Sequence, residues 1–87
     1  MKEIREKIDA IDDQIIKLYQ ERMALIKEVA LHKASLKTGI TDITDTAREK
    51  AILERILKDI SPEIRGYAEQ FYDAVFQTSK AYQRGFM

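Results

Sequence analysis

With 87 residues, no cysteine and no tryptophan, the chain is too short for two folded units, and we expect a single domain over residues 1–87. Fifteen basic and fifteen acidic side chains cancel to a formal charge of zero. No run of like charges is long enough to bind nucleic acid or a membrane surface. The lack of cysteine excludes disulfides and thiolate metal sites, and His32 alone cannot form a histidine cluster, so we expect no metal site.

The N-terminal segment from Met1 to Arg5 enters an amphipathic pattern directly, without the apolar core of a signal peptide. No apolar run approaches the ~20 residues that a transmembrane helix needs. We therefore expect a cytoplasmic protein that does not bind a membrane.

The first predicted element is a long helix from Lys2 to about Leu36. No glycine or proline interrupts it before Gly39, and its apolar residues recur at spacings of three and four, which place them on one stripe of a helix. Such a helix would be roughly 50 Å long and would exceed the ~30 Å span of a compact domain of this size. Much of the stripe would be exposed in a monomer, and a second copy is the simplest cover. The stripe comprises Ile4, Ile8, Ile11, Ile15, Leu18, Leu25 and Val29.

A loop is predicted over residues 37–44, which contain Gly39, Thr38, Thr41 and Asp42. The second helix should begin near Asp45 or Thr46. Its inward-facing residues are predicted to be Ile52, Leu53, Ile56 and Leu57.

A third helix is predicted from Pro62 to about Arg84, with Gly85 as its stop. Ser61-Pro62-Glu63 combines a capping side chain, a proline suited to the first turn and an acid that is favourable to the helix dipole. The chain is therefore all-α with three helices, one of them very long. The predicted inner face of the third helix includes Ile64, Tyr67, Phe71, Ala74, Val75 and Phe76.

Arg22 interrupts the apolar stripe, because it stands where the spacing from Leu18 predicts an apolar residue. Burying a guanidinium without a partner costs several kcal/mol, so a protein carboxylate or a ligand anion should face it. Lys33 lies eleven residues later, about 16 Å along the axis and nearly on the same face, which leaves a gap suited to a small dianion. Arg5 is roughly 25 Å from Arg22 and about 100° around the helix, so it could reach the same ligand only from a second subunit.

Polar residues also gather on single faces of the two later helices. Asp45, Arg48 and Glu49 have i, i+3, i+4 spacing, which places them together on the first turns of the second helix. Ser79 and Gln83 are four residues apart, so a hydroxyl and an amide stack on one face of the third helix.

Each of these residues also has a purely structural interpretation. Arg22 could pair with an internal carboxylate, and the charge of Lys33 suits the C-terminal end of a helix. Thr46-Ala47-Arg48-Glu49 fits a capping box in which Glu49 caps the second helix. Ser79 and Gln83 would then be ordinary polar surface, and Arg5 alone would be unremarkable.

Taken together, the set resembles the all-helical chorismate mutase family, and the resemblance covers nearly the whole chain. The spacing between Arg5, Arg22 and Lys33 carries most of its specificity. The matching motifs, in chain order, are the segment from Ile4 to Ile15, Glu21-Arg22-Met23, Val29-Ala30 shortly before Lys33, Asp45 to Glu49, and Ser79 with Gln83.

The resemblance implies an enzyme that rearranges chorismate to prephenate in phenylalanine and tyrosine biosynthesis without a cofactor. It also implies an intertwined six-helix homodimer. Two alternatives remain open at this stage. One is an isochorismate-pyruvate lyase, which a similar basic pocket could support. The other is a non-catalytic helical dimerisation or regulatory module.

For the carboxylate end of the substrate, the resemblance implies that Arg22 and Arg5 of a second copy bind the two carboxylates. Ser79 and Arg48 would support that end of the pocket.

For the reacting end, the resemblance implies that Lys33 and Gln83 donate hydrogen bonds to the ether oxygen whose bond breaks. Glu49, helped by Asp45, would bind the ring hydroxyl. The apolar wall would consist of Val29, Ile52 and Phe76.

Overall fold

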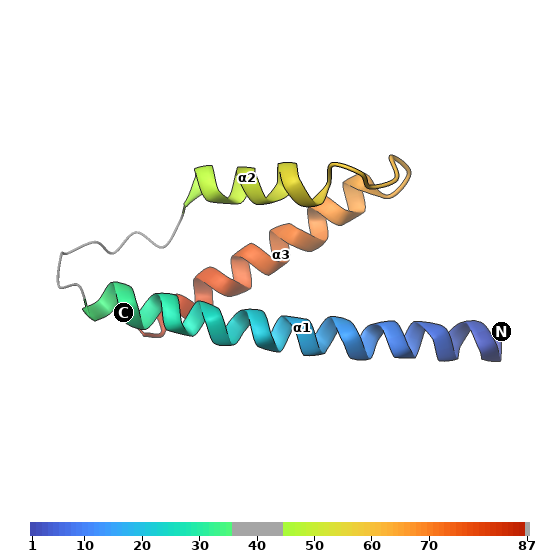
Figure 1. Cartoon of the computed structure of the whole chain (residues 1–87), viewed down its shortest axis with the longest axis horizontal. Helices are drawn as coiled ribbons and strands as arrows, with labels where there is room; N and C mark the ends of the chain where they lie inside the picture. Colours follow the sequence, from blue (N-terminus) through green and yellow to red (C-terminus); the bar gives the residue numbers. More distant parts are fainter. Residues whose placement is uncertain (36–44, 87) are drawn as a thin grey trace.

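The computed structural model describes residues 1–35 and 45–86, and these residues form three helices without any strand. They are α1 (Lys2–Ser35), α2 (Thr46–Ile56) and α3 (Arg65–Arg84). Figure 1 shows α1 running along the whole molecule, with α3 crossing diagonally between α1 and α2. Helix α3 packs against both of the others and therefore joins them into one unit. The predicted all-α class with one very long helix is confirmed.

Helix α1 has the predicted length, since it begins at Lys2 and ends at Ser35. Its 34 residues correspond to about 51 Å at 1.5 Å per residue. Glu3 in the first turn and Lys33 in the last turn complement the helix dipole. Leu36 and the predicted loop at 37–44 lie outside the described residues.

Helix α2 begins at Thr46 because Asp45 caps it. The Asp45 carboxylate accepts a hydrogen bond of 2.9 Å from the backbone N–H of Arg48, which satisfies one of the free donors of the first turn. The predicted start is confirmed. The capping-box interpretation is wrong, because the cap is Asp45 rather than Thr46, and the side chain of Glu49 makes a different contact.

The predicted start of α3 at Pro62 is wrong by three residues. Residues 61–64 instead form a turn, closed by a hydrogen bond of 3.1 Å from the N–H of Ile64 to the carbonyl of Ser61. Proline is favoured at the second position of such turns, so the same residue suits both structures. Arg65 then starts the helix, and its guanidinium donates to the carbonyl of Leu57 at 3.1 Å. The predicted end at Arg84, followed by Gly85, is confirmed.

The buried apolar residues are few and lie where α3 meets the other two helices. They are Ala30, Leu57, Val75 and Phe76. The prediction for the inner face of α3 is therefore confirmed for Val75 and Phe76. In the single chain it is wrong for the residues nearer the N-terminus of the helix. Ile64, Tyr67, Phe71 and Ala74 are exposed there, because this part diverges from α1 (Figure 1). On α2, Leu57 is buried and Ile52, Leu53 and Ile56 are half-buried, as predicted.

The apolar stripe of α1 is exposed along its whole length, as predicted for a single chain. Ile11, for example, is 53% exposed and Leu18 is 62% exposed. A different face of α1 is shielded from solvent by the rest of the chain, and it comprises Tyr19, Arg22, Met23, Ile26, Ala30 and Lys33. The radius of gyration is 16.0 Å, whereas a compact chain of this length would have about 12 Å.

No helix within residues 1–35 and 45–86 combines the length and the apolar character needed to cross a bilayer.

Candidate active site

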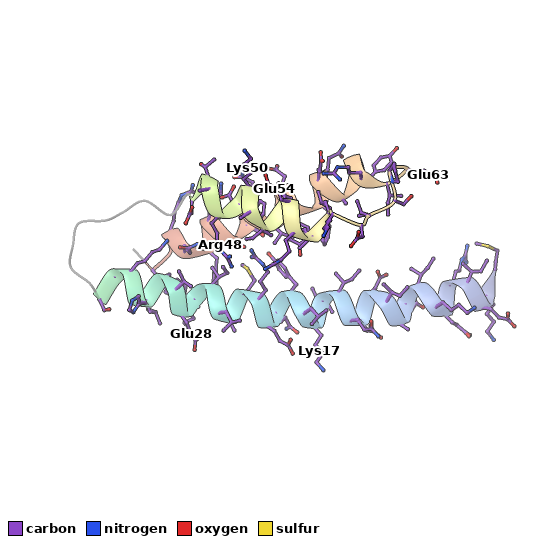
Figure 2. The ribbon with its side chains drawn as sticks, turned by 45° about the horizontal axis from the view of Figure 1, so that its top comes forward. Lys17, Glu28, Arg48, Lys50, Glu54 and Glu63 are labelled. Atoms are coloured by element: carbon purple, nitrogen blue, oxygen red, sulfur yellow. The ribbon has the colours of Figure 1, made fainter. Side chains whose placement is uncertain are left out.

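A cleft of about 310 Å³ lies where the three helices meet, and it gathers most of the polar residues that the sequence singled out. Figure 2 shows Arg48 extending from α2 towards α1, whereas Lys50 points away from the opposite side of α2. Every predicted site residue except Arg5 lines this cleft. The lining consists of Arg22, Ile26, Val29, Lys33, Asp45, Arg48, Glu49, Ile52, Phe76, Ser79, Lys80 and Gln83.

Arg22 is half-buried and is held by a hydroxyl rather than by a carboxylate. Its guanidinium donates to the Oγ of Ser79 at 2.5 Å, and Ser79 in turn donates to the carbonyl of Val75 at 2.6 Å. Among residues 1–35 and 45–86, no carboxylate forms an ion pair with Arg22. Of the two alternatives, the internal carboxylate partner is therefore wrong for the described part of the chain. A guanidinium has five N–H donors, so most of them are available to an anion in the cleft.

Glu49 contacts a lysine across the interface between α2 and α3. Its Oε2 lies 3.3 Å from the Nζ of Lys80, and the side chains of Lys80 and Glu49 are 11% and 26% exposed. This pair is far better shielded than the other described ion pair, Arg65 with Glu69, in which both side chains are 51% exposed.

Gln83 carries an unusual buried amide. The residue is 6% exposed, and its Oε1 has no hydrogen-bond partner among the described residues. Buried polar groups in proteins almost always have a partner, so this oxygen would accept a hydrogen bond from a water, a ligand or a second subunit. Because a rotation of 180° exchanges the oxygen and nitrogen of an amide, Gln83 can offer the cleft either an acceptor or a donor.

The charges in the cleft favour an anion. Four cationic side chains line it, against the carboxylates of Asp45 and Glu49. The electrostatic potential of a concave site lined by excess positive charge attracts negatively charged ligands. The four cations are Arg22, Lys33, Arg48 and Lys80.

Arg5 is the one predicted site residue that a single chain does not bring to the cleft. It is exposed near the start of α1, seventeen residues before Arg22, which corresponds to roughly 25 Å along the helix. Its proposed role therefore requires a second copy.

Sequence reasoning missed two residues that line the cleft, Ile26 and Lys80. Lys80 lies four residues after Phe76 and three before Gln83, so its spacing on the face of α3 was the available signal. Ile26 lies four residues after Arg22, which places it on the same face of α1.

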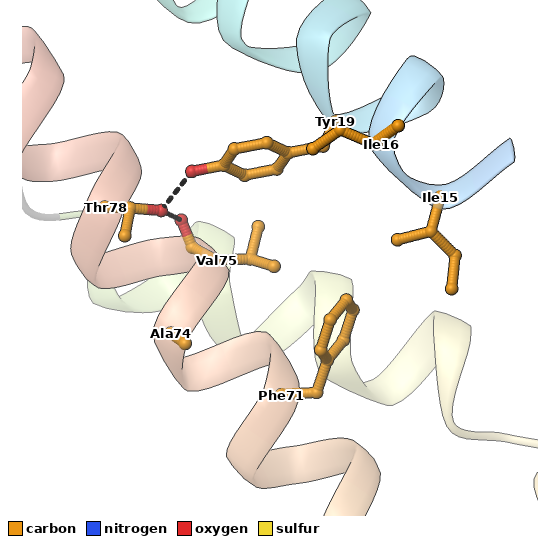
Figure 3. A pocket seen from close by; sticks show the side chains of 7 residues that line it. All are labelled: Ile15, Ile16, Tyr19, Phe71, Ala74, Val75 and Thr78. Carbon is orange, nitrogen blue, oxygen red and sulfur yellow. Dashed lines mark hydrogen bonds between the residues drawn. The ribbon is translucent and has the colours of Figure 1, made fainter. Parts of the chain in front are cut away.

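A second hollow, between α1 and the middle of α3, is apolar apart from two hydroxyl groups (Figure 3). Tyr19 and Thr78 share a hydrogen bond of 2.6 Å at its edge. No charged side chain lines it, so it lacks the excess positive charge of the cleft. The hollow is lined by Ile15, Ile16, Tyr19, Phe71, Ala74, Val75 and Thr78.

Metal-ligating side chains do not gather in the described part of the chain, where no cluster of three or more His, Cys, Asp or Glu residues could hold an ion.

The family profile described as chorismate mutase type II matches residues 4–84. The chain belongs to this family. The match includes the cleft and all three helices, and it confirms the resemblance inferred from the sequence.

A chorismate mutase of Methanocaldococcus jannaschii is 54% identical to the chain over 56 residues. The aligned region covers 64% of this chain and 54% of that protein, so the chain matches about half of the relative's length. No solved structure shows significant similarity to the chain.

Proposed function

We propose that the chain is a chorismate mutase that converts chorismate to prephenate, in the cytoplasm and as a single domain over residues 1–87. The observation that supports this proposal most directly is the cleft, in which four cationic side chains face two carboxylates. Chorismate is a dianion with two carboxylates, and it also carries an ether oxygen and a ring hydroxyl. Family membership and the relative from M. jannaschii support the same activity.

In this proposal the carboxylates bind at the Arg22 end of the cleft. The hydrogen bond from Arg22 to Ser79 fixes the plane of the guanidinium and leaves its other N–H groups for a bidentate contact. Arg48, whose backbone N–H is tied to Asp45, adds a second cation from α2. Arg5 of a second copy binds the remaining carboxylate.

Lys33 and Gln83 are the catalytic donors in this proposal, and they approach the ether oxygen from α1 and α3. Negative charge grows on this oxygen as its bond to the ring lengthens. A fixed ammonium and a fixed amide N–H therefore bind the transition state more tightly than the substrate, which lowers the barrier. The buried position of Gln83 favours this effect, because electrostatic interactions are stronger where water is excluded.

Glu49 accepts a hydrogen bond from the ring hydroxyl, with Asp45 beside it at the start of α2. Apolar contacts to the ring and the enolpyruvyl arm come from Val29, Ile52 and Phe76, which line the cleft between the polar groups. These contacts hold the arm over the ring. Such restriction to a reactive conformer can supply several kcal/mol of the required acceleration.

The proposed active unit is an intertwined homodimer of six helices. Its support is the exposed apolar stripe of α1 and the elongated shape of the single chain, 54 × 25 × 15 Å. A second copy that lies along this stripe would remove the apolar side chains from water, at roughly 25 cal/mol per Å² of buried area. It would also bring Arg5 to the opposite cleft.

The experiment that tests the activity is product identification. The purified chain is incubated with chorismate and, separately, with isochorismate, and the products are separated by liquid chromatography. The proposal predicts prephenate from chorismate at a rate far above the uncatalysed reaction. Pyruvate release from isochorismate would establish the lyase instead, and no turnover of either compound would leave a non-catalytic module.

A further inference from the structure

Lys80 is the one cation of the cleft to which the family resemblance gives no role. It is 9% exposed and lies on α3 between Ser79 and Gln83, two residues of the proposed site. Lysine is rarely this well buried unless a partner compensates its charge. Here the partner is Glu49, at 3.3 Å across the α2–α3 interface.

The shielding of this pair separates it from an ordinary surface ion pair. Exposed pairs such as Arg65 with Glu69 contribute little, because solvent screens them. Where both side chains are largely removed from water, the loss of one partner leaves the other charge uncompensated. Lys80 and Glu49 therefore constrain one another.

The contact uses only part of the carboxylate. Lys80 lies against Oε2 of Glu49, and an ionised carboxylate has a second oxygen with its own lone pairs. The first turn of α2 does not need Glu49 either, because Asp45 is the cap. One oxygen of Glu49 is thus held by Lys80, while the other remains available to accept a hydrogen bond in the cleft.

From this geometry we infer that Lys80 is a positioning residue, which holds the carboxylate of Glu49 directed at the ring hydroxyl of the substrate. The inference rests on the function proposed above. It also explains why a carboxylate can line a cleft that must bind a dianion. Without Lys80, Glu49 would be attracted to Arg22, Lys33 or Arg48 and would compete with the substrate for them.

The test compares Lys80→Met, Lys80→Arg, Glu49→Gln and the double variant Lys80→Met/Glu49→Gln in steady-state turnover of chorismate. Lys80→Met keeps the apolar stem but removes the charge, and it should lower kcat/KM about tenfold. Lys80→Arg should recover most of this loss. Because Lys80 acts through Glu49, Lys80→Met and Glu49→Gln should change kcat and KM in the same proportions. The double variant should be no worse than Glu49→Gln alone.

Lys50→Met is the matched control, since Lys50 is exposed on α2 and points away from the cleft (Figure 2). It should retain wild-type kinetics. If Lys80→Met destabilises the fold in thermal unfolding, Lys80→Gln replaces it as a neutral, polar variant. Wild-type kcat/KM in the neutral Lys80 variant overturns the inference. It is also overturned if the loss of kcat/KM in the double variant equals the product of the losses in the two single variants. In both cases the wild type still makes prephenate, whereas an inactive wild type overturns the proposed function itself.

Discussion

At the scale of single residues, the cleft is built from polar side chains whose neighbours fix their orientation. Ser79 holds the guanidinium of Arg22, and Lys80 holds the carboxylate of Glu49. Gln83 is the exception, because its Oε1 is buried without a partner in the described part of the chain. Turning the amide by 180° would bring its NH₂ group to the place of Oε1, where it could donate to the ether oxygen of the substrate.

The amide of Gln83 bears on how kcat/KM should depend on pH. An amide does not titrate, so kcat/KM of the wild type should be flat from neutral to mildly alkaline pH. A glutamate at this position donates a hydrogen bond only when it is protonated, so Gln83→Glu should lose activity as the pH rises. Rate profiles of both proteins between pH 5 and 9 provide the measurement, and a steep loss in the wild type between pH 6 and 8 would contradict the role of Gln83.

At the scale of helices, the sequence was sufficient to predict three elements and most of their bounds. The spacing of apolar residues predicted α1 to within one residue, and Asp45 correctly marked the start of α2. The start of α3 was wrong because proline at position 62 suits a turn as well as a helix N-terminus. A proline signal of this kind does not distinguish a turn from the first turn of a helix. Here Ile64, two residues after the proline, has a non-helical ψ of 0°, and the helix starts after it.

The candidate site was predictable where it depended on helical spacing and not where it depended on contacts between helices. Arg22, Lys33, Ser79 and Gln83 were identified from spacing and from the family resemblance. Lys80 was missed, because an isolated lysine is usually solvated and only the approach of α2 to α3 pairs it with Glu49.

The cap of α2 makes a prediction about stability. Asp45→Ala removes the acceptor for the N–H of Arg48 and should lower the free energy of unfolding by about 1 kcal/mol. Asp45→Asn keeps a side-chain oxygen and should lose much less. Urea unfolding at a fixed protein concentration measures both variants.

Thr46→Ala serves as the control, because Thr46 is the first residue inside the helix and not its cap. It should show no loss of stability. A loss for Thr46→Ala as large as that for Asp45→Ala would contradict the assignment of Asp45 as the cap and favour the capping box.

At the scale of the whole molecule, a single chain leaves its longest helix largely uncovered. The apolar stripe from Ile4 to Val29 faces solvent, and the N-terminal end of α1 extends beyond the other two helices (Figure 1). Long contiguous apolar surfaces mark interaction sites in soluble proteins. Covering the stripe with a second copy completes a core and, in the proposed arrangement, delivers Arg5 to the partner's cleft.

Shared clefts make a prediction that subunit mixing can test. Arg5→Ala and Lys33→Ala should each abolish most of the activity as homodimers. When the two are unfolded and refolded together in equal amounts, mixed dimers should contain one intact cleft, which has Lys33 from one chain and Arg5 from the other. About a quarter of the wild-type activity should return. Failure to recover activity, although native mass spectrometry shows mixed dimers, would contradict the contribution of Arg5 across subunits.

In the proposed reaction, Lys33 stabilises the negative charge that grows on the ether oxygen as its bond to the ring breaks. The most direct measurement is the kcat for loss of chorismate's ultraviolet absorbance in the wild type, in Lys33→Ala and in Lys17→Ala. Lys17 is an exposed lysine on the same helix and lies outside the cleft (Figure 2). We expect the kcat of Lys33→Ala to fall on the order of a hundredfold or more, comparable to the removal of one oxyanion donor. The kcat of Lys17→Ala should not change. A Lys33→Ala variant that turns over chorismate as fast as Lys17→Ala would contradict this role of Lys33.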